Sequence, residues 1–186
     1  MPPLETPQIN KRFKAKDFKL MGIDGKSYSI SDVKSKNGLV VAFICNHCPY
    51  VQAITDKIVQ DVADLAKIEI GFVGINSNDT EAYPDDSFDN MKIFAEQHKF
   101  NFPYLFDETQ EIAKEYDAVC TPDFFCFDKD QRLVYRGRLD SAGKHHVPDA
   151  KRELFNAMEI VASGQSINHI KQYPSIGCSI KWKVCI

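Results

Sequence analysis

The sequence feature that most limits the fold is an apolar run that leads directly into a pair of cysteines. Residues 39–44 read LVVAFI, and residues 45–49 read CNHCP. A continuous, partly β-branched apolar run is typical of a strand that is buried on both faces. The apolar residues that follow recur at the steps of three and four expected for one helical face: Val51, Ile54, Ile58, Val62 and Leu65. The pattern predicts a strand followed at once by a helix that begins at the cysteines.

Further strands and helices are predicted to alternate along the chain. Residues 17–30 alternate around Asp24 and Gly25, which is typical of a β-hairpin. We expect strands, in order, at residues 68–75, 104–106, 124–127 and 132–138. Spacing and capping residues indicate helices near residues 88–94, 107–116 and 154–161. The order is that of an α/β protein, with a hairpin in front and a tail behind.

Length, charge and composition limit the classes of function. A chain of 186 residues, 44% of them apolar, is long enough for one sizeable core. We therefore expect a single domain over residues 1–186, with a core of about residues 15–164 and a C-terminal extension at residues 165–186. The net charge of −3 comes from well-mixed charges, which favours neither a nucleic acid nor a membrane as partner. The N-terminus lacks the apolar core of a secretory signal, so we expect a cytoplasmic protein.

Six cysteines, at positions 45, 48, 120, 126, 178 and 185, are too irregularly spread to predict a framework of disulfides. In a reducing cytosol, a CxxC pair is more often catalytic or metal-binding than structural. A zinc site usually needs a second such pair, and none is visible, so we expect neither a resident metal ion nor a cofactor. Cys126 alternates within a predicted strand and is expected in the core, whereas Cys185 is expected to be exposed.

The position of the CxxC pair favours thiol chemistry. The first turn of a helix exposes unpaired backbone N–H groups with partial positive charge, which lower the pKa of a cysteine placed there. We expect Cys45 to be that cysteine. Cys48 lies about one turn later, close enough to resolve a mixed disulfide formed at Cys45. His47, when protonated, would add positive charge beside the thiolate, and Pro49 suits the first helical turn.

Several stretches of the sequence resemble the thioredoxin-like superfamily, and within it the redoxin subgroup (AhpC/TSA, peroxiredoxin-like). They read DGKSYSISD, FICNHCPYV, VGINSND, FPYLFDETQEIAKEYDAVCTPDFFCFD and PSIGCSIKWK. The resemblance implies a thioredoxin fold, with a central mixed β-sheet flanked by helices and an added N-terminal β-hairpin and C-terminal tail. It also implies that Thr121 and Pro122 form a cis-proline peptide that faces the dithiol, beside backbone that pairs with an incoming peptide or thiol.

Two departures from the related families bear on the activity. Thioredoxins carry a buried acid six residues before the first cysteine, where this chain has Leu39, and their dipeptide between the cysteines is not Asn-His. Peroxiredoxins have the pattern Pro-x-x-x-Thr-x-x-Cys; with Cys48 as its cysteine, Val41 replaces the proline and Cys45 the threonine. These differences weaken both a general reductase and a standard peroxiredoxin mechanism.

Two further cysteines are candidates for resolving a disulfide or a sulfenic acid formed at the CxxC pair. Cys120 precedes Pro122 by two residues, and the implied fold brings it near Cys45; a packing role is equally expected. Cys178 belongs to the tail, and a flexible tail could carry it to the site, although simple packing is the more expected role. The polar loop at residues 76–86 is expected to be solvated.

These observations together predict a thiol–disulfide oxidoreductase. Cys45 would attack as thiolate, Cys48 would resolve, His47 would tune the pair, and Thr121 with Pro122 would shape the docking surface. The expected partners are a protein or small-molecule thiol or disulfide and a reductant such as thioredoxin or glutathione. One alternative is a peroxiredoxin-like thiol peroxidase that reduces hydroperoxides. Another is a copper-binding module that uses the two cysteines and a histidine.

Overall fold

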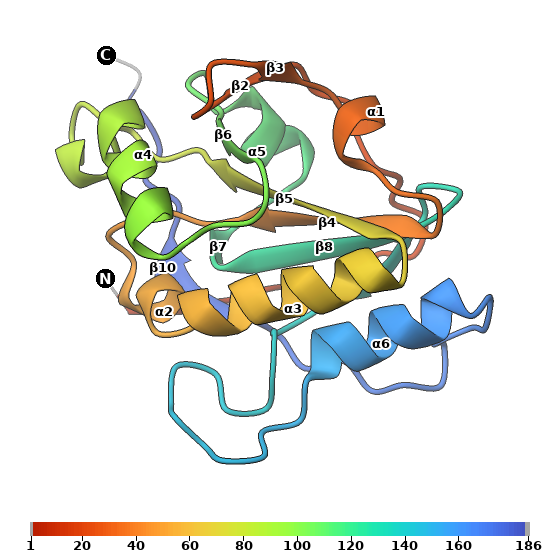
Figure 1. Cartoon of the computed structure of the whole chain (residues 1–186). Helices are drawn as coiled ribbons and strands as arrows, with labels where there is room; N and C mark the ends of the chain where they lie inside the picture. Colours follow the sequence, from red (N-terminus) through yellow and green to blue (C-terminus); the bar gives the residue numbers. More distant parts are fainter. Residues whose placement is uncertain (1, 185–186) are drawn as a thin grey trace.

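The apolar run forms β4 (Gly38–Phe43), a fully buried strand at the centre of the molecule (Figure 1). Its side chains alternate between two halves of the core. Val40 and Ala42 contribute to one half, and Val41 and Phe43 contribute to the other. Both faces of the strand are therefore covered, as the sequence pattern predicts.

The strands around β4 form a mixed sheet. In spatial order they are β3 (Ser27–Tyr28), β2 (Leu20–Gly22), β6 (Tyr104–Phe106), β5 (Ile70–Asn76), β4, β8 (Asp123–Asp128) and β9 (Leu133–Arg136). β5 and β6 are parallel, whereas β2 with β3, β4 with β8, and β8 with β9 are antiparallel. β5 lies beside β4, and the Ile44 N–H donates to the Ile75 C=O at 3.0 Å. The C-terminal ends of β4 and β5 therefore lie together.

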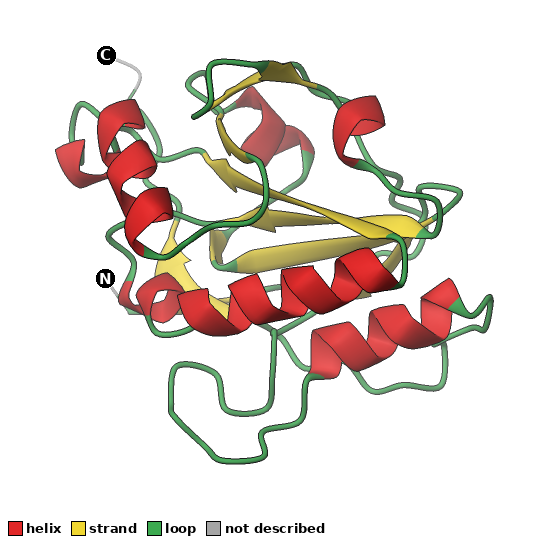
Figure 2. Ribbon diagram, viewed as in Figure 1, coloured by secondary structure: helices red, strands yellow, loops and turns green. Residues whose placement is uncertain are grey.

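Helices pack on both faces of this sheet (Figure 2). The half of the core that contains Val40 also receives side chains from α3 (Thr55–Lys67), α4 (Phe88–Gln97) and α6 (Glu153–Ala162). The other half receives side chains from α1 (Ile30–Val33) and α5 (Glu111–Glu115). The predicted α/β architecture, a central mixed sheet flanked by helices with an N-terminal hairpin, is confirmed. No helix among residues 2–184, the part of the chain that the structure describes, is long and apolar enough to cross a membrane.

The expectation of one continuous helix after the cysteines is wrong. A short helix, α2 (Pro49–Gln52), begins after Cys48 and ends at Ala53, and α3 begins only at Thr55. Between them Ile54 leaves the helical conformation, with φ −123° and ψ 4°. Ile54 stays buried against the same core as α3, so its spacing gives no sign of the break. The interruption separates α2, which Cys48 caps, from α3.

The C-terminal tail returns to the dithiol as a strand in a second, small sheet. In this sheet β10 (Ile176–Ser179) lies between β1 (Leu4–Glu5) and β7 (Cys120–Thr121), antiparallel to both. Cys178 stands opposite Thr121, and Ser179 stands opposite Cys120. The Ser175 hydroxyl donates to the Pro122 C=O at 2.7 Å just before the strand. The computed structural model thus ties the tail to the loop that holds Pro122.

Gly177 allows this close approach. A Cβ atom at this position would lie 1.9 Å from the Thr121 carbonyl oxygen and 3.0 Å from the Pro122 nitrogen, far inside van der Waals contact. Both of these atoms belong to the backbone, so they cannot move aside as a flexible side chain would. Any larger residue at this position must separate β10 from β7.

We therefore predict that Gly177→Ala loosens the tail. The expected loss of unfolding free energy is about 3 kcal/mol, the upper end for an overpacked site. Amide hydrogen exchange should accelerate in β10 but not in β4. Gly143→Ala is the control, because no atom lies within 4 Å of its new Cβ and only the left-handed backbone, φ 58°, is strained. Equal protection of β10 in the two variants would contradict the prediction.

Candidate active site

The structure brings both cysteines of the CxxC pair onto the Thr121-Pro122 peptide, which is cis. Cys45 follows β4, and its Sγ lies 3.4 Å from the Thr121 Oγ1. Cys48 is the N-cap of α2, and its Sγ lies 3.1 Å from the Thr121 carbonyl oxygen, to which it donates when protonated. The site thus joins the end of the central strand, the start of α2 and the loop between β7 and β8. It gathers four of the predicted site residues, Cys45, Cys48, Thr121 and Pro122.

Both sulfurs of the pair are withdrawn from solvent. Cys45 is 1% exposed and Cys48 is fully buried. Cys120 is also fully buried, with its thiol donating to the Pro122 C=O at 3.7 Å, and its pKa is raised by burial. Cys126 is buried in the core, as expected, and Cys185 lies outside the described residues. Cys178 is partly exposed, which distinguishes it from the other described cysteines.

Within the pair, the proton is favoured on Cys45 over Cys48. The Cys45 thiol donates a hydrogen bond to the Cys48 sulfur, which raises the pKa of Cys45 well above its ordinary value, and burial and the charge of Asp86 raise it further. The same hydrogen bond lowers the pKa of Cys48 to about 5, against the opposing effect of burial. The Cys178 and Val51 backbone N–H groups also lower it. These shifts favour the thiolate form at Cys48 over Cys45.

The sequence pattern predicts Cys45 as the thiolate, whereas the pKa directions favour Cys48. That expectation assumed that Cys45 occupies the helix N-terminus, whereas Cys48 is the N-cap and Cys45 precedes it by almost one turn. The unpaired amides of the first turn therefore surround Cys48. Cys45 instead sits between the end of β4 and a buried carboxylate, where a negative charge is disfavoured.

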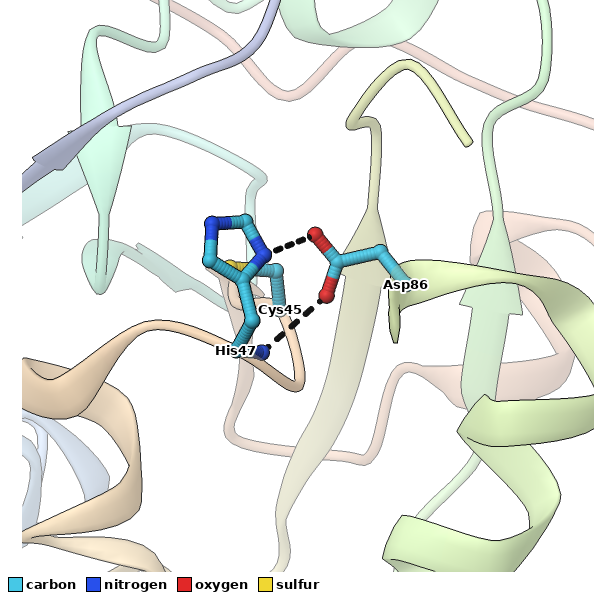
Figure 3. Close-up of side chains that lie close together, drawn as sticks. All are labelled: Cys45, His47 and Asp86. Atoms are coloured by element: carbon cyan, nitrogen blue, oxygen red, sulfur yellow. Dashed lines mark hydrogen bonds and ion pairs between the residues drawn. The ribbon is translucent and has the colours of Figure 1, made fainter. Parts of the chain in front are cut away.

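That carboxylate belongs to Asp86, which orders the dipeptide between the cysteines (Figure 3). Asp86 is fully buried in a short 3₁₀ helix, η1 (Pro84–Asp86). Its Oδ1 accepts from the backbone N–H groups of Asn46 at 2.8 Å and His47 at 3.1 Å. Its Oδ2 accepts from the Asn78 Nδ2 at 2.7 Å and pairs with the His47 Nδ1 at 2.5 Å. One side chain thus holds both residues of the Asn-His dipeptide.

The expectation of a solvated loop at residues 76–86 is wrong for its functional part. Asn76, Asn78 and Asp86 are buried, while residues 81–85 are exposed. The missed signal was the placement of polar residues directly after β5. Because β4 and β5 end at the same edge of the sheet, residues that follow them lie together.

Contact with Asp86 favours the protonated form of His47. The hydrogen bond to that carboxylate raises the pKa of His47, although burial opposes the shift. Burial would raise the pKa of Asp86, but hydrogen bonds from His47 and Asn78 outweigh it, so this pKa is lowered. The imidazole also stacks on Tyr83, with ring centroids 5.5 Å apart and an interplanar angle of 7°. Asp86 is therefore the main source of the shift at His47, and Cys48 adds a smaller effect in the same direction.

The same residues form the one group of possible metal ligands found among residues 2–184. Ligand atoms of Cys45, His47 and Asp86 all lie within 4.8 Å of one another (Figure 3). Both Asp86 oxygens, however, already accept hydrogen bonds from N–H donors, and Cys45 holds its proton. Cys48, which a copper site of two cysteines and a histidine would require, is not part of the group. Hydrogen bonding accounts for this arrangement better than a metal ion does.

We predict that Asp86→Asn lowers the pKa of His47. The variant removes the charge that raises this pKa and sets an amide donor against the Asn78 donor, at an expected cost of about 2–3 kcal/mol of stability. NMR titration of the imidazole should show His47 above its ordinary value of 6.5 in the wild type and shifted downward in the variant. Asp85→Asn, which removes an exposed neighbouring carboxylate, should leave the titration unchanged. An unshifted His47 in Asp86→Asn would contradict the assignment.

The ion pair also sets a pH window. The lowered pKa of Asp86 contributes stability above its ordinary value of 3.8, which is lost as the pH falls through the lowered value. The raised pKa of His47 contributes stability below 6.5, which is lost as the pH rises through the raised value. The stability difference between wild type and Asp86→Asn should therefore be largest between pH 3.8 and 6.5.

Comparison with known proteins agrees with this geometry. The AhpC/TSA family model matches residues 12–136. The chain is similar to an uncharacterized conserved protein from Geobacillus kaustophilus, with 44% identity, a TM-score of 0.94 and coverage of 100% of this chain and 99% of that one. It is also similar to a hypothetical protein from Sinorhizobium meliloti, with 36% identity, a TM-score of 0.91 and coverage of 97% and 99%.

A secreted disulfide oxidoreductase from Mycobacterium tuberculosis shares the fold, with 21% identity, a TM-score of 0.53 and coverage of 62% of this chain and 79% of that one. No curated protein matches the chain. The implied thioredoxin fold is confirmed by these structural neighbours. With its dithiol set at the end of the central strand, the chain belongs to the AhpC/TSA family of thioredoxin-fold oxidoreductases.

Proposed function

We propose that the protein is a thiol–disulfide oxidoreductase whose dithiol is Cys45 and Cys48. The observation that carries the proposal is the placement of both sulfurs against Thr121, with the Cys45 Sγ 3.4 Å from its Oγ1 and the Cys48 Sγ 3.1 Å from its carbonyl oxygen. The pKa directions favour Cys48 as the thiolate of the pair and Cys45 as the thiol. A thiolate is the nucleophile of disulfide exchange, and a neighbouring thiol in contact with it is placed to complete the exchange. The pair therefore has both parts that the reaction needs.

In the net reaction a substrate disulfide takes two electrons from the pair. The Cys48 thiolate bonds to one substrate sulfur and the other leaves as a thiolate, which takes up a proton from water. The Cys45 sulfur, as its proton departs, then bonds to Cys48 and releases the second substrate thiol. The products are two substrate thiols and a Cys45–Cys48 disulfide, which a reductant such as thioredoxin or glutathione returns to the dithiol by the reverse exchange.

The surrounding residues have supporting roles in this proposal. The Thr121 hydroxyl lies 3.4 Å from the Cys45 Sγ, and the Thr121 side chain lowers the pKa of both cysteines, which favours a thiolate at either sulfur. Pro122 follows Thr121 in the cis peptide and keeps that residue against the dithiol. His47 and Asp86 hold the loop between the cysteines and keep a negative charge near Cys45, which favours the proton staying there.

A thiol peroxidase is the second candidate, and the state of Cys48 is the observation that favours it. Cys48 is the cysteine that aligns with the peroxidatic position, and it is the one with the lowered pKa. Peroxide would convert its thiolate to a sulfenic acid, releasing hydroxide or alkoxide, and the Cys45 thiol would condense with it and release water. The two candidates share their residues and differ in the oxidant.

The deciding measurement is mass spectrometry of alkylated protein after equilibration in glutathione buffers. We expect a reversible Cys45–Cys48 disulfide, which either single replacement by serine abolishes. One equivalent of hydrogen peroxide should form this disulfide no faster than it oxidises a free thiol. Rapid, stoichiometric oxidation of Cys48 by peroxide would establish the peroxidase instead, and absence of the disulfide at every ratio would refute both.

The location of the charge is tested by ultraviolet absorbance of the thiolate as a function of pH. Because the pKa of Cys48 is lowered to about 5, thiolate absorbance in the reduced wild type should rise as the pH passes through about 5. Cys45→Ala should move this transition upward, because it removes the principal donor. Cys45→Ser, which keeps a hydroxyl donor, should move it less. If Cys48→Ser retained the transition near pH 5, the thiolate would be Cys45.

A further inference from the structure

The C-terminal strand β10 covers the dithiol at the edge of the Thr121-Pro122 peptide. Its pairing with β7 places Cys178 directly opposite Thr121, the residue that both dithiol sulfurs contact. Figure 1 shows β10, drawn in blue, lying across the end of β7 close to α2. The tail thus brings a third cysteine to the site from the far end of the sequence.

Cys178 lies beside the dithiol. It stands opposite Thr121, whose carbonyl oxygen is 3.1 Å from the Cys48 Sγ and whose hydroxyl is 3.4 Å from the Cys45 Sγ. Cys178 also packs against the part of the core that contains Cys45 and Cys48. Hydrogen bonding with Cys48 helps to raise the pKa of Cys178, and the Cys178 backbone N–H lowers the pKa of Cys48. The three cysteines therefore gather around Thr121.

The three sulfurs differ in their access to solvent. Cys45 and Cys48 are at most 1% exposed, whereas Cys178 is partly exposed. An external thiol or disulfide that approaches the site meets Cys178 first. Because β10 already fills the pairing edge of Thr121, an incoming peptide cannot take the place beside it while the strand is seated.

Contacts on both sides of Cys178 hold β10 in this position. Gly177 provides the space for close approach to Thr121, and Ser175 bonds to the Pro122 C=O. Beyond the strand, the Lys181 backbone N–H donates to the Asn78 Oδ1 at 2.9 Å, and its C=O accepts from the Asp79 N–H at 2.8 Å. Cys178 therefore stands at the dithiol without the tail movement that the sequence suggested.

We propose that Cys178 is the outer member of a three-cysteine relay, through which the buried dithiol exchanges its disulfide with external thiols. The proposal rests on the proposed function, because it starts from the Cys45–Cys48 disulfide. In this proposal β10 occupies the backbone edge of Thr121 with which a substrate peptide would otherwise pair. The proposal also names the substrate class as thiols and disulfides that reach a partly exposed cysteine, in place of peptides that pair with Thr121.

The first step is internal and needs no outside reagent. The Cys178 sulfur attacks the Cys48 sulfur, a Cys48–Cys178 disulfide forms, the Cys45–Cys48 bond breaks, and Cys45 takes up the proton that Cys178 gives up. An external thiolate then attacks Cys178, and Cys48 leaves as thiolate. A thiolate with a lowered pKa is a good leaving group, which favours this direction of cleavage.

A second external thiol completes the reduction. It attacks the external sulfur of the mixed disulfide on Cys178, an external disulfide forms, and Cys178 leaves and is protonated. In total, two external thiols lose two electrons and two protons, and the dithiol gains them. The same steps run in reverse when an external disulfide oxidises the protein.

The test is the rate at which reduced glutathione reduces the oxidised full-length protein, followed by acid quenching, alkylation and mass spectrometry. We expect Cys178→Ser to slow the reduction about tenfold or more, because external thiols lose their accessible sulfur. The Cys45–Cys48 disulfide should still form in this variant, since Cys178 takes no part in that bond. The Ser179→Ala variant, which changes the adjacent residue on the same strand, should be reduced by glutathione at the wild-type rate.

A second variant traps the proposed intermediate. Cys45→Ser leaves Cys48 and Cys178 as the reactive neighbours, and oxidised glutathione should convert them to a Cys48–Cys178 disulfide. A glutathione adduct on Cys48 with Cys178 free would overturn the relay, as would reduction of Cys178→Ser at or above the wild-type rate. Equal slowing by Ser179→Ala would also overturn it, because the packing of the strand would then be responsible.

These outcomes separate the relay from the function on which it rests. A Cys45–Cys48 disulfide that forms in Cys178→Ser and is reduced at the wild-type rate refutes the relay and leaves the oxidoreductase intact. Failure of that disulfide to form in the wild type, at any glutathione ratio, refutes both.

Discussion

A negative charge on Cys48 has no solvent to stabilise it, and the site is arranged around that constraint. A buried ion is tolerated only when donors replace the water that it has lost. Here the donors are the Cys45 thiol, the Thr121 hydroxyl, and the backbone N–H groups of Cys178 and Val51. They come from the end of the central strand, the cis-proline loop, the tail and the first turn of α2. The thiolate form of Cys48 is favoured because these four segments meet.

The buried carboxylate of Asp86 favours a negative charge on Cys48 over one on Cys45. Asp86 lies close enough to Cys45 to raise the pKa of that thiol, which keeps the proton on Cys45 and leaves the charge on Cys48. Its own charge is balanced by His47 and by amide donors of the CxxC loop. The polar residues after β5 therefore belong to the site as much as the cysteines do. They hold the loop in position and direct the proton to one sulfur of the pair.

Sequence patterns were reliable where a local regularity decides the outcome. The buried central strand, the hairpin and the placement of the cysteines at a strand-to-helix turn all follow from periodicity within a few residues. Patterns failed where the decision is made by contact between distant segments. The break at Ile54 keeps the helical spacing of apolar residues, so no pattern shows it. Asp86 looks like any acidic residue of a polar loop until β5 is placed beside β4.

The sequence by itself determined the alternating α/β order, the dithiol and, through family resemblance, the proline that faces it. Only the tertiary structure decided which sulfur carries the charge and which cysteine meets the outside. Cys48 is favoured as the thiolate because it caps α2, whereas Cys45 lies beside a buried carboxylate. Cys178 reaches Cys48 because Gly177 lets β10 pack against Thr121, a backbone contact between segments far apart in the chain. Spacing along a chain carries no record of such contacts, since they depend on how whole strands pair.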